Sequence, residues 1–216
     1  MTDEEIVALV TTEFTSPVLG VTEQYLKIHE PVYENGLLKV ARIDREKWTD
    51  ENVIIAYLPV KGERFFFAVY IIGNEIFNIG TESRNMVFLR ATSEEMSPKE
   101  MQAYIGIVPT ALFKKDAFYP NGKRQYKINC IEYEPNPEPD EFEDKLIKLL
   151  RSLEKDKAGV LDLSNRAKLC IQANLDFHAG NQLLGAAFVN LECIKLMSEL
   201  NLEISLDVTA WGNPFK

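Results

Sequence analysis

The chain has 216 residues and a formal net charge of -9, with 46% hydrophobic and 26% charged residues. This composition is that of an ordinary globular protein, and it excludes disordered, collagen-like and coiled-coil chains. Because excess acidic residues repel phosphate backbones, it also argues against a protein that coats nucleic acid. The length fits one large domain or two small ones.

The sequence predicts a cytoplasmic protein. It begins Met1-Thr2-Asp3-Glu4-Glu5, which is acidic where a secretory signal is basic. Its most apolar run, residues 65–72, is far shorter than the roughly 20 residues that a membrane helix needs. The 3 cysteines are widely spaced, which favours neither a disulfide framework nor a thiolate zinc site. We therefore expect no membrane span, no metal and no cofactor.

The charge balance changes near residue 83. Residues 1–83 contain 14 acidic and 7 basic side chains, whereas residues 84–216 contain 19 acidic and 17 basic ones. The change falls in a turn-rich segment, residues 80–85. We predict an acidic, strand-rich N-terminal domain over residues 1–83 and a second domain over residues 84–216.

The N-terminal domain is predicted to be a mostly antiparallel β-meander that follows one short helix. Thr2 and Glu5 have the spacing of a capping box, and apolar residues follow on one helix face. β-Branched and aromatic residues then predict strands at 24–28, 37–43, 53–60, 64–72 and 75–79. Short connections such as Asn35-Gly36 and Gly73-Asn74 favour antiparallel hairpins between them.

The C-terminal domain is predicted to be an α/β-sandwich with helices packed on a sheet, which makes the whole chain α+β. The sequence predicts strands at 86–91, 126–133, 168–177 and 203–209. Helices are predicted from Ser97-Pro98 to a left-handed stop at Gly106, over 140–155 with Asp140 as the cap, and over 187–200. The strand order stays open.

The 2 histidines of the chain lack a catalytic signature. His178 follows Asp176 by two residues on a predicted strand, so both side chains would face one way, as in half of a general-base pair. No nucleophile motif accompanies them, and a solvent-exposed histidine at a strand end is the simpler interpretation. His29 is expected in a turn. The sequence therefore predicts no catalytic residue and no zinc ligand.

A basic cluster interrupts the acidic chain. It is rich in aromatic residues and contains Lys114, Lys115, Lys123, Arg124 and Lys127. Such a cluster can bind an anion, a small ligand or an acidic surface, although an ordinary solvated loop has the same composition. In the N-terminal domain, Glu46, Asp50 and Glu51 form an acidic patch that can steer a basic protein partner.

Residues 87–213 resemble a bacterial family known as domain-of-unknown-function family 4279. The resemblance is carried by residues 88–93, the helix start 94–100, the segment 105–110, the basic loop with Asn121-Gly122, and residues 206–212. The segment 105–110 resembles the family signature leucine-Gly-Ile-x-Pro-Thr. Asn129-Cys130-Ile131 stands where the family often has a tryptophan. Because the family has no established catalytic residues, the resemblance implies the fold and leaves the function open.

These features favour a non-enzymatic protein-binding module. Phe65–Ile72, the strand that follows and Ala91-Thr92-Ser93 resemble arrangements in small bacterial immunity-type proteins. The specific expectation is therefore an immunity protein that neutralises a basic toxin domain through Glu46, Asp50 and Glu51. The alternative is a small-ligand-binding protein or an enzyme that uses the loop 114–127 with Asp176 and His178. Neither nucleic acid nor a membrane is an expected partner, and the oligomeric state stays open.

Overall fold

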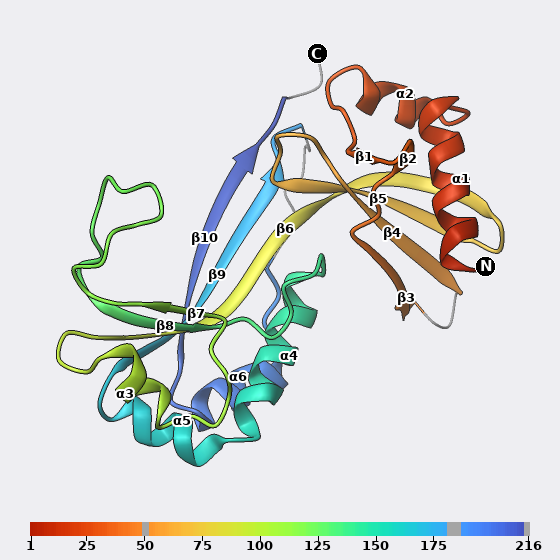
Figure 1. Ribbon diagram of the computed structural model, residues 1–216. Coiled ribbons are helices and arrows are strands. Elements are labelled where there is room, and N and C mark those ends of the chain that lie inside the picture. The colour runs from red at the N-terminus through yellow and green to blue at the C-terminus, as the bar shows by residue number, and fades with distance from the viewer. Residues whose placement is uncertain (49–51, 181–186, 214–216) are drawn as a thin grey trace. The chain divides into compact units, whose positions relative to one another are not determined.

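The structure is a computed structural model that describes residues 1–48, 52–180 and 187–213 (Figure 1). It has the α+β class that the sequence predicts. The described helices are α1 (Asp3–Thr15), α2 (Gly20–Leu26), α3 (Pro98–Gln102), α4 (Phe142–Glu154), α5 (Lys157–Ser164) and α6 (Leu191–Glu199). The described strands are β1 (Tyr33–Glu34), β2 (Leu37–Leu38), β3 (Arg42–Trp48), β4 (Val53–Pro59), β5 (Phe65–Ile72), β6 (Glu75–Ser93), β7 (Ala111–Phe113), β8 (Asn129–Tyr133), β9 (Lys168–His178) and β10 (Glu203–Trp211).

The chain divides into two compact units. The first contains Met1–Arg84, Asp176–Gly185 and Val208–Lys216, and the second contains Asn85–Leu175 and Ala186–Asp207. Strands β6, β9 and β10 contribute residues to both units. The first unit thus combines the N-terminal residues with two segments from near the C-terminus.

In the first unit, β3, β4, β5 and the first half of β6 form an antiparallel sheet. Helices α1 and α2 lie on one face of this sheet (Figure 1). Ile6, Val10 and Phe14 of α1 are buried together with Tyr25 of α2 and Phe67 of β5. The Phe67 ring centroid lies 5.4 Å from that of Phe14 and 5.3 Å from that of Tyr25. Burial of such side chains, at about 1.5–3 kcal/mol each, holds the helices on the sheet.

Residues 24–28, predicted as a strand, are instead the end of α2 and the turn that follows. The prediction was wrong because contacts distant in sequence favour the helix. Glu13 of α1 accepts hydrogen bonds from the backbone N–H groups of Val18 and Leu19, at the start of α2. One turn of helix also places Tyr25 against Phe67. Such tertiary contacts override a local strand preference.

The turn predicted at residues 80–85 is also wrong. Strand β6 continues from Glu75 to Ser93, so two predicted strands are one. Gly80 pairs with Ala68 of β5, and Ser83 pairs with Phe65. Pairing with β5 satisfies the backbone groups of this segment, so the chain has no need to turn there.

In the second unit, β9 lies between β6 and β10 in the strand order, and β8 pairs with both β6 and β7. Helix α4 contacts α5 and α6 (Figure 1). Its buried face consists of apolar residues at helical spacing, including Leu146, Leu149 and Leu153. The helix predicted over 140–155 is therefore confirmed. Its N-cap is Glu141 rather than Asp140, and the Asp140 carboxylate accepts hydrogen bonds from the Glu141 N–H group and from Lys148 Nζ.

The segment 105–110 has a structural role. The N–H group of Gly106 donates to Asp156 Oδ2 at 2.6 Å, and the hydroxyl of Thr110 donates to the carbonyl of Glu132 at 3.0 Å. Gly106 does not have the positive φ of the predicted left-handed helix stop, so that prediction was wrong. Asp156 is also the N-cap of α5, a helix that the sequence analysis missed, and it accepts from the N–H group of Gly159.

Candidate functional site

Residues 114–127 of the second unit form an arm that extends from β7 and β8, here called the basic hairpin (Figure 1). Backbone hydrogen bonds of 2.8 Å join the N–H group of Asp116 to the carbonyl of Tyr126 and that of Tyr119 to the carbonyl of Arg124. Gly122 closes the turn with a φ of 67°, which glycine adopts without strain. The predicted basic loop is therefore a folded hairpin.

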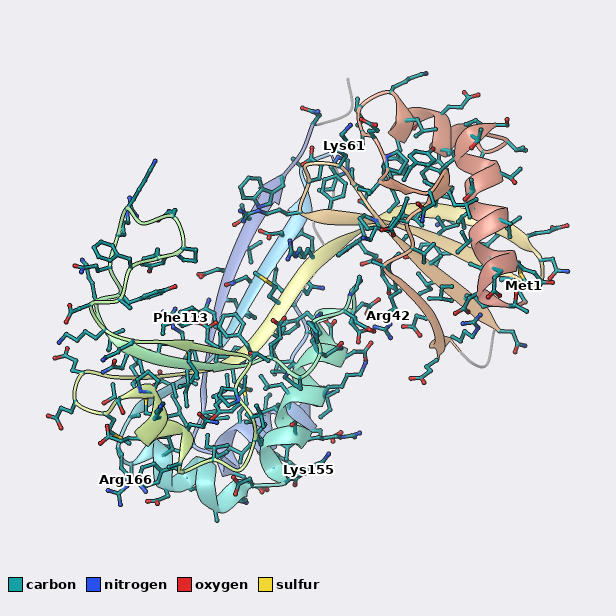
Figure 2. All side chains as sticks on the ribbon, viewed as in Figure 1. Met1, Arg42, Lys61, Phe113, Lys155 and Arg166 are labelled. Carbon is teal, nitrogen blue, oxygen red and sulfur yellow. The ribbon has the colours of Figure 1, made fainter. Side chains whose placement is uncertain are left out.

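Aromatic rings line one side of the basic hairpin. The ring centroids of Tyr119 and Tyr126 lie 4.1 Å apart in a stacked arrangement, with 20° between the ring planes. The ring of Phe113, labelled in Figure 2 at the base of the arm, lies 4.8 Å from that of Tyr126. Such ring pairs contribute about 0.5–1.5 kcal/mol each beyond the area that they bury. The stack therefore stiffens the arm.

A cavity of about 650 Å³ lies beside this stack. Its lining joins one residue of β6 to residues of the hairpin and β8: Arg90, Asp116, Tyr119, Arg124, Gln125, Tyr126, Lys127, Ile128 and Cys130. Three of these side chains are cationic and one is acidic. Two other cavities in the same unit, of about 360 and 580 Å³, balance cations with acids. The basic-hairpin cavity differs from both because its lining has an excess of positive charge.

One of the three cations that line this cavity, Arg90, lies beside a partly buried carboxylate. Arg90 Nε lies 3.9 Å from Glu132 Oε1. Burial raises the pKa of Glu132, and the charge of Arg90 opposes that rise. Burial also raises the pKa of the Cys130 thiol, so this group stays neutral at physiological pH and is a poor nucleophile. Even with Glu132 counted beside Asp116, cations outnumber acids around the cavity, which suits it to holding an anion, and its cysteine is not activated for covalent chemistry.

The predicted anion-binding residues have different positions. Arg124 lines the cavity, whereas Lys114, Lys115 and Lys123 lie on the same hairpin without lining it. The backbone N–H group of Lys115 donates to Asn129 Oδ1 at 2.8 Å, so this residue helps to anchor the hairpin. His178 belongs to the first unit.

Sequence reasoning missed Arg90 as a cavity residue. Its only local signal is a cation within the apolar run of β6, between Leu89 and Ala91, which are buried. Lys127, which also lines the cavity, belonged to the predicted basic cluster but not to the predicted site. Only the pairing of β6 with β8 shows that Arg90 lies beside the hairpin.

The first unit brings together the two histidines of the chain. The Nε2 atoms of His29 and His178 lie 2.9 Å apart, and the residues are 7% and 1% exposed. Nε2 of His178 also lies 3.0 Å from the carbonyl oxygen of Asn213. The His178 ring packs against Phe65, with centroids 4.6 Å apart. The interpretation of His178 as a solvent-exposed strand-end residue was therefore wrong.

Two carboxylates of the first unit lie beside His29 and beside Trp211. Glu63 Oε1 lies 3.6 Å from His29 Nδ1. Asp176 Oδ1 accepts a hydrogen bond of 2.8 Å from the indole N–H group of Trp211. The guanidinium of Arg64 lies 4.3 Å from the centre of the Trp211 ring, in a cation–π contact. The predicted Asp176 carboxylate thus fixes the end of β10.

The predicted acidic patch is described only in part. Glu46 is exposed on β3, which is at the end of the strand order, whereas Asp50 and Glu51 lie outside the described residues. Over residues 1–48, 52–180 and 187–213, no group of three or more His, Cys, Asp and Glu residues is placed to hold a metal ion. Among the described helices, none combines the length and apolarity needed to span a membrane.

The family described as Domain of unknown function (DUF4279) matches residues 81–211. The match begins within β6, ends at the last residue of β10 and includes the basic hairpin. Comparisons with curated proteins and with solved structures gave no significant match. Because the matched segment is more than half of the chain, this protein belongs to the DUF4279 family.

Proposed function

We propose that this protein binds a small anionic ligand with a planar ring in the basic-hairpin cavity. The observation that carries the proposal is the lining, which combines three cationic side chains with a stacked tyrosine pair. A volume of about 650 Å³ is within the usual range of about 300–1,000 Å³ for small-molecule sites. A non-enzymatic binding role is consistent with the raised pKa of Cys130, which keeps the thiol protonated.

Charge selects the anionic part of the ligand. Arg90, Arg124 and Lys127 oppose the single carboxylate of Asp116 among the lining residues. Guanidinium groups donate paired hydrogen bonds to carboxylate or phosphate oxygens, and each such charge-assisted bond contributes about 1.5–3 kcal/mol. Since the cavity is open to solvent, added salt weakens this attraction.

The tyrosine pair favours a ligand that carries a planar ring. Tyr119 is 41% exposed beside the cavity, so one ring of the stack remains accessible to a ligand. Aromatic rings favour offset stacking with other planar groups. The amide of Gln125 supplies both a donor and an acceptor for ring substituents.

Binding is tested by isothermal titration of the whole chain with nucleoside monophosphates and aromatic carboxylates, at low and moderate salt. Inorganic phosphate and the uncharged nucleosides are the comparison ligands. We expect at least one planar anion to bind more tightly than either its uncharged counterpart or phosphate alone. If no planar anion binds in either salt, the proposal is wrong.

Arg124→Gln is expected to weaken the binding of that ligand about 10-fold or more, because it removes one charge-assisted contact. The matched control is Lys114→Gln, which removes the same charge from an exposed residue of the same hairpin that does not line the cavity. We expect the control to change the affinity less than about 2-fold. An equal loss in both variants indicates nonspecific attraction by the arm and contradicts a site in the cavity.

A protein-binding function, with an immunity role against a basic toxin domain as its specific form, stays a second proposal. It is supported by the excess of acidic residues and by the exposure of Glu46 on an edge strand. Glu46→Lys should slow association with such a partner, and an unchanged association rate would count against this surface. The free thiols of Cys130, Cys170 and Cys193 support a reducing, cytoplasmic location for either function.

A further inference from the structure

We propose that His29 and His178 form a proton-sensitive histidine pair. One proton between their Nε2 atoms gives a hydrogen bond that holds the end of β10 in place, and the two rings separate when a second proton binds there. This proposal concerns the first unit and is independent of ligand binding in the second. It rests on the distance of 2.9 Å between the two Nε2 atoms, on their burial, and on the backbone that both rings contact.

The distance defines the protonation state of the closed pair. Two Nε2 atoms at 2.9 Å form a hydrogen bond only when one carries a proton and the other is an acceptor. Glu63 Oε1 is 3.6 Å from Nδ1 of His29, which favours a proton on that nitrogen and leaves Nε2 as the acceptor. His178 then carries its proton on Nε2, where it faces both His29 and the carbonyl oxygen of Asn213.

A second proton between the two Nε2 atoms would set two N–H groups against each other and add one positive charge inside the first unit. The groups that face the pair are Glu63 beside His29, the Asn213 carbonyl, and the neutral phenol of Tyr25 on α2, whose ring centroid is 6.3 Å from that of His178. On β9, Asp176 is held by Trp211 and lies 4.0 Å from Arg64 Nη1. Glu63 alone among these contacts the pair as an anion, and it lies beside Nδ1 of His29, so it cannot replace the acceptor that the second proton removes between the two Nε2 atoms.

The pKa of His29 agrees with this arrangement. Burial lowers it most, and the neighbouring His178 lowers it further, against the opposing effects of Glu63 and the Asn213 carbonyl. A histidine whose pKa is lower in the folded than in the unfolded state contributes stability above the unfolded pKa of about 6.5. That stability decreases as the pH falls below about 6.5 and is lost once the pH has passed the folded pKa.

The histidine pair supports the backbone of the residues that end and follow β10. The N–H group of Ala179 donates to the carbonyl of Trp211 at 2.7 Å, directly beside the histidine pair. A Cβ atom on Gly212 would lie 2.8 Å from the Phe65 ring and 3.1 Å from the His29 ring, so the backbone at Gly212 lies against both rings. Separation of the two histidines therefore removes the support of this backbone.

The first test is nuclear magnetic resonance of the wild-type chain, whose 2 histidines are the only source of imidazole signals. At pH 7.5 we expect His29 protonated on Nδ1 and His178 on Nε2. Below about pH 6.5 and down to pH 5, hydrogen-exchange protection of the Ala179 amide and the Trp211 indole should fall about 10-fold per pH unit, the dependence for one proton taken up on opening. Independent titration of both rings near pH 6.5 with constant protection would overturn the proposal.

The second test is the double variant H29Q/H178Q, because two amides can form a hydrogen bond at this position without titrating. Its protection is expected to be independent of pH over the same range. Lys61→Gln, which removes an exposed charge that pairs with Glu30, the residue after His29, is the control and should keep the wild-type pH dependence. If the double variant does not fold, the wild-type measurement decides. An increase in protection on adding Zn²⁺ at pH 7.5 would assign the two nitrogens to a metal and contradict a shared proton.

Discussion

Gly159→Ala is expected to destabilise the protein by about 2–4 kcal/mol, although alanine is the better helix former. Gly159 is in the first turn of α5, where a Cβ atom would collide with the backbone carbonyl oxygen of Tyr104. It would also meet the carboxylate of Asp156 at 2.6 Å and 2.9 Å. A backbone atom cannot turn away as a side chain can, so the helix or the Tyr104 segment must shift.

Moving Asp156 would cost free energy beyond the relief of the steric clash, because its carboxylate is the acceptor for two backbone N–H groups. Its carboxylate accepts hydrogen bonds from the N–H groups of Gly106 and Gly159. Displacing the carboxylate therefore disrupts the cap of α5 and the anchor of the segment 105–110 together. Loss of a cap by itself costs about 0.5–2 kcal/mol.

Equilibrium unfolding in urea measures the effect. Gly106→Ala is a control in the same unit, because the nearest atom to its Cβ would be Asp156 Oδ2 at the ordinary contact distance of 3.4 Å. Gly20→Ala is a second control, with no atom within 4 Å of its Cβ. Both controls should change stability by less than about 1 kcal/mol. A Gly159→Ala variant as stable as these controls would show that the close approach of Tyr104 is absent.

Glu13→Ala is expected to destabilise the protein by about 2–4 kcal/mol. Glu13 is 7% exposed on α1, and its carboxylate accepts from the backbone N–H groups of Val18 and Leu19 and from the hydroxyl of Thr22 at 2.6 Å. The N-cap residue of α2, Leu19, makes no side-chain cap bond of its own. Glu13 therefore supplies the cap from another helix, and alanine would leave three donors without this acceptor.

Urea unfolding of Glu13→Ala, Glu13→Gln and Glu23→Ala separates the contributions. Glutamine keeps one oxygen acceptor but loses the charge that favours a helix N-terminus, so we expect about half the loss of the alanine variant. Glu23 is exposed on α2, and its replacement should change stability by less than about 0.5 kcal/mol. Equal stabilities for Glu13→Ala and Glu23→Ala would contradict the proposed capping role.

Local sequence signals predicted several elements well. The capping boxes of Thr2 with Glu5 and of Ser97 with Glu100 are both present in the structure. Helix α4 and strands β4, β5 and β9 lie close to their predicted ranges. These signals succeed because hydrogen bonds and apolar periodicity act between residues only a few positions apart.

Two segments whose structure depends on distant partners were predicted wrongly. Residues 80–85 have the composition of a turn, yet pairing with β5 keeps them extended. Residues 24–28 have the composition of a strand, yet the Glu13 cap and the burial of Tyr25 make most of them helical. In both segments the free energy of tertiary contacts exceeds the small local preference.

Composition, apolar periodicity and motif spacing are local properties, so they were enough to predict the α+β class, the family and the position of the basic cluster. Only the tertiary structure placed Arg90 beside Arg124 and His29 beside His178, which is 149 residues further along the chain. Strand pairing and helix packing bring such residues together, and a shift of one residue in strand register would turn their side chains to the opposite face. Both candidate sites depend on that register.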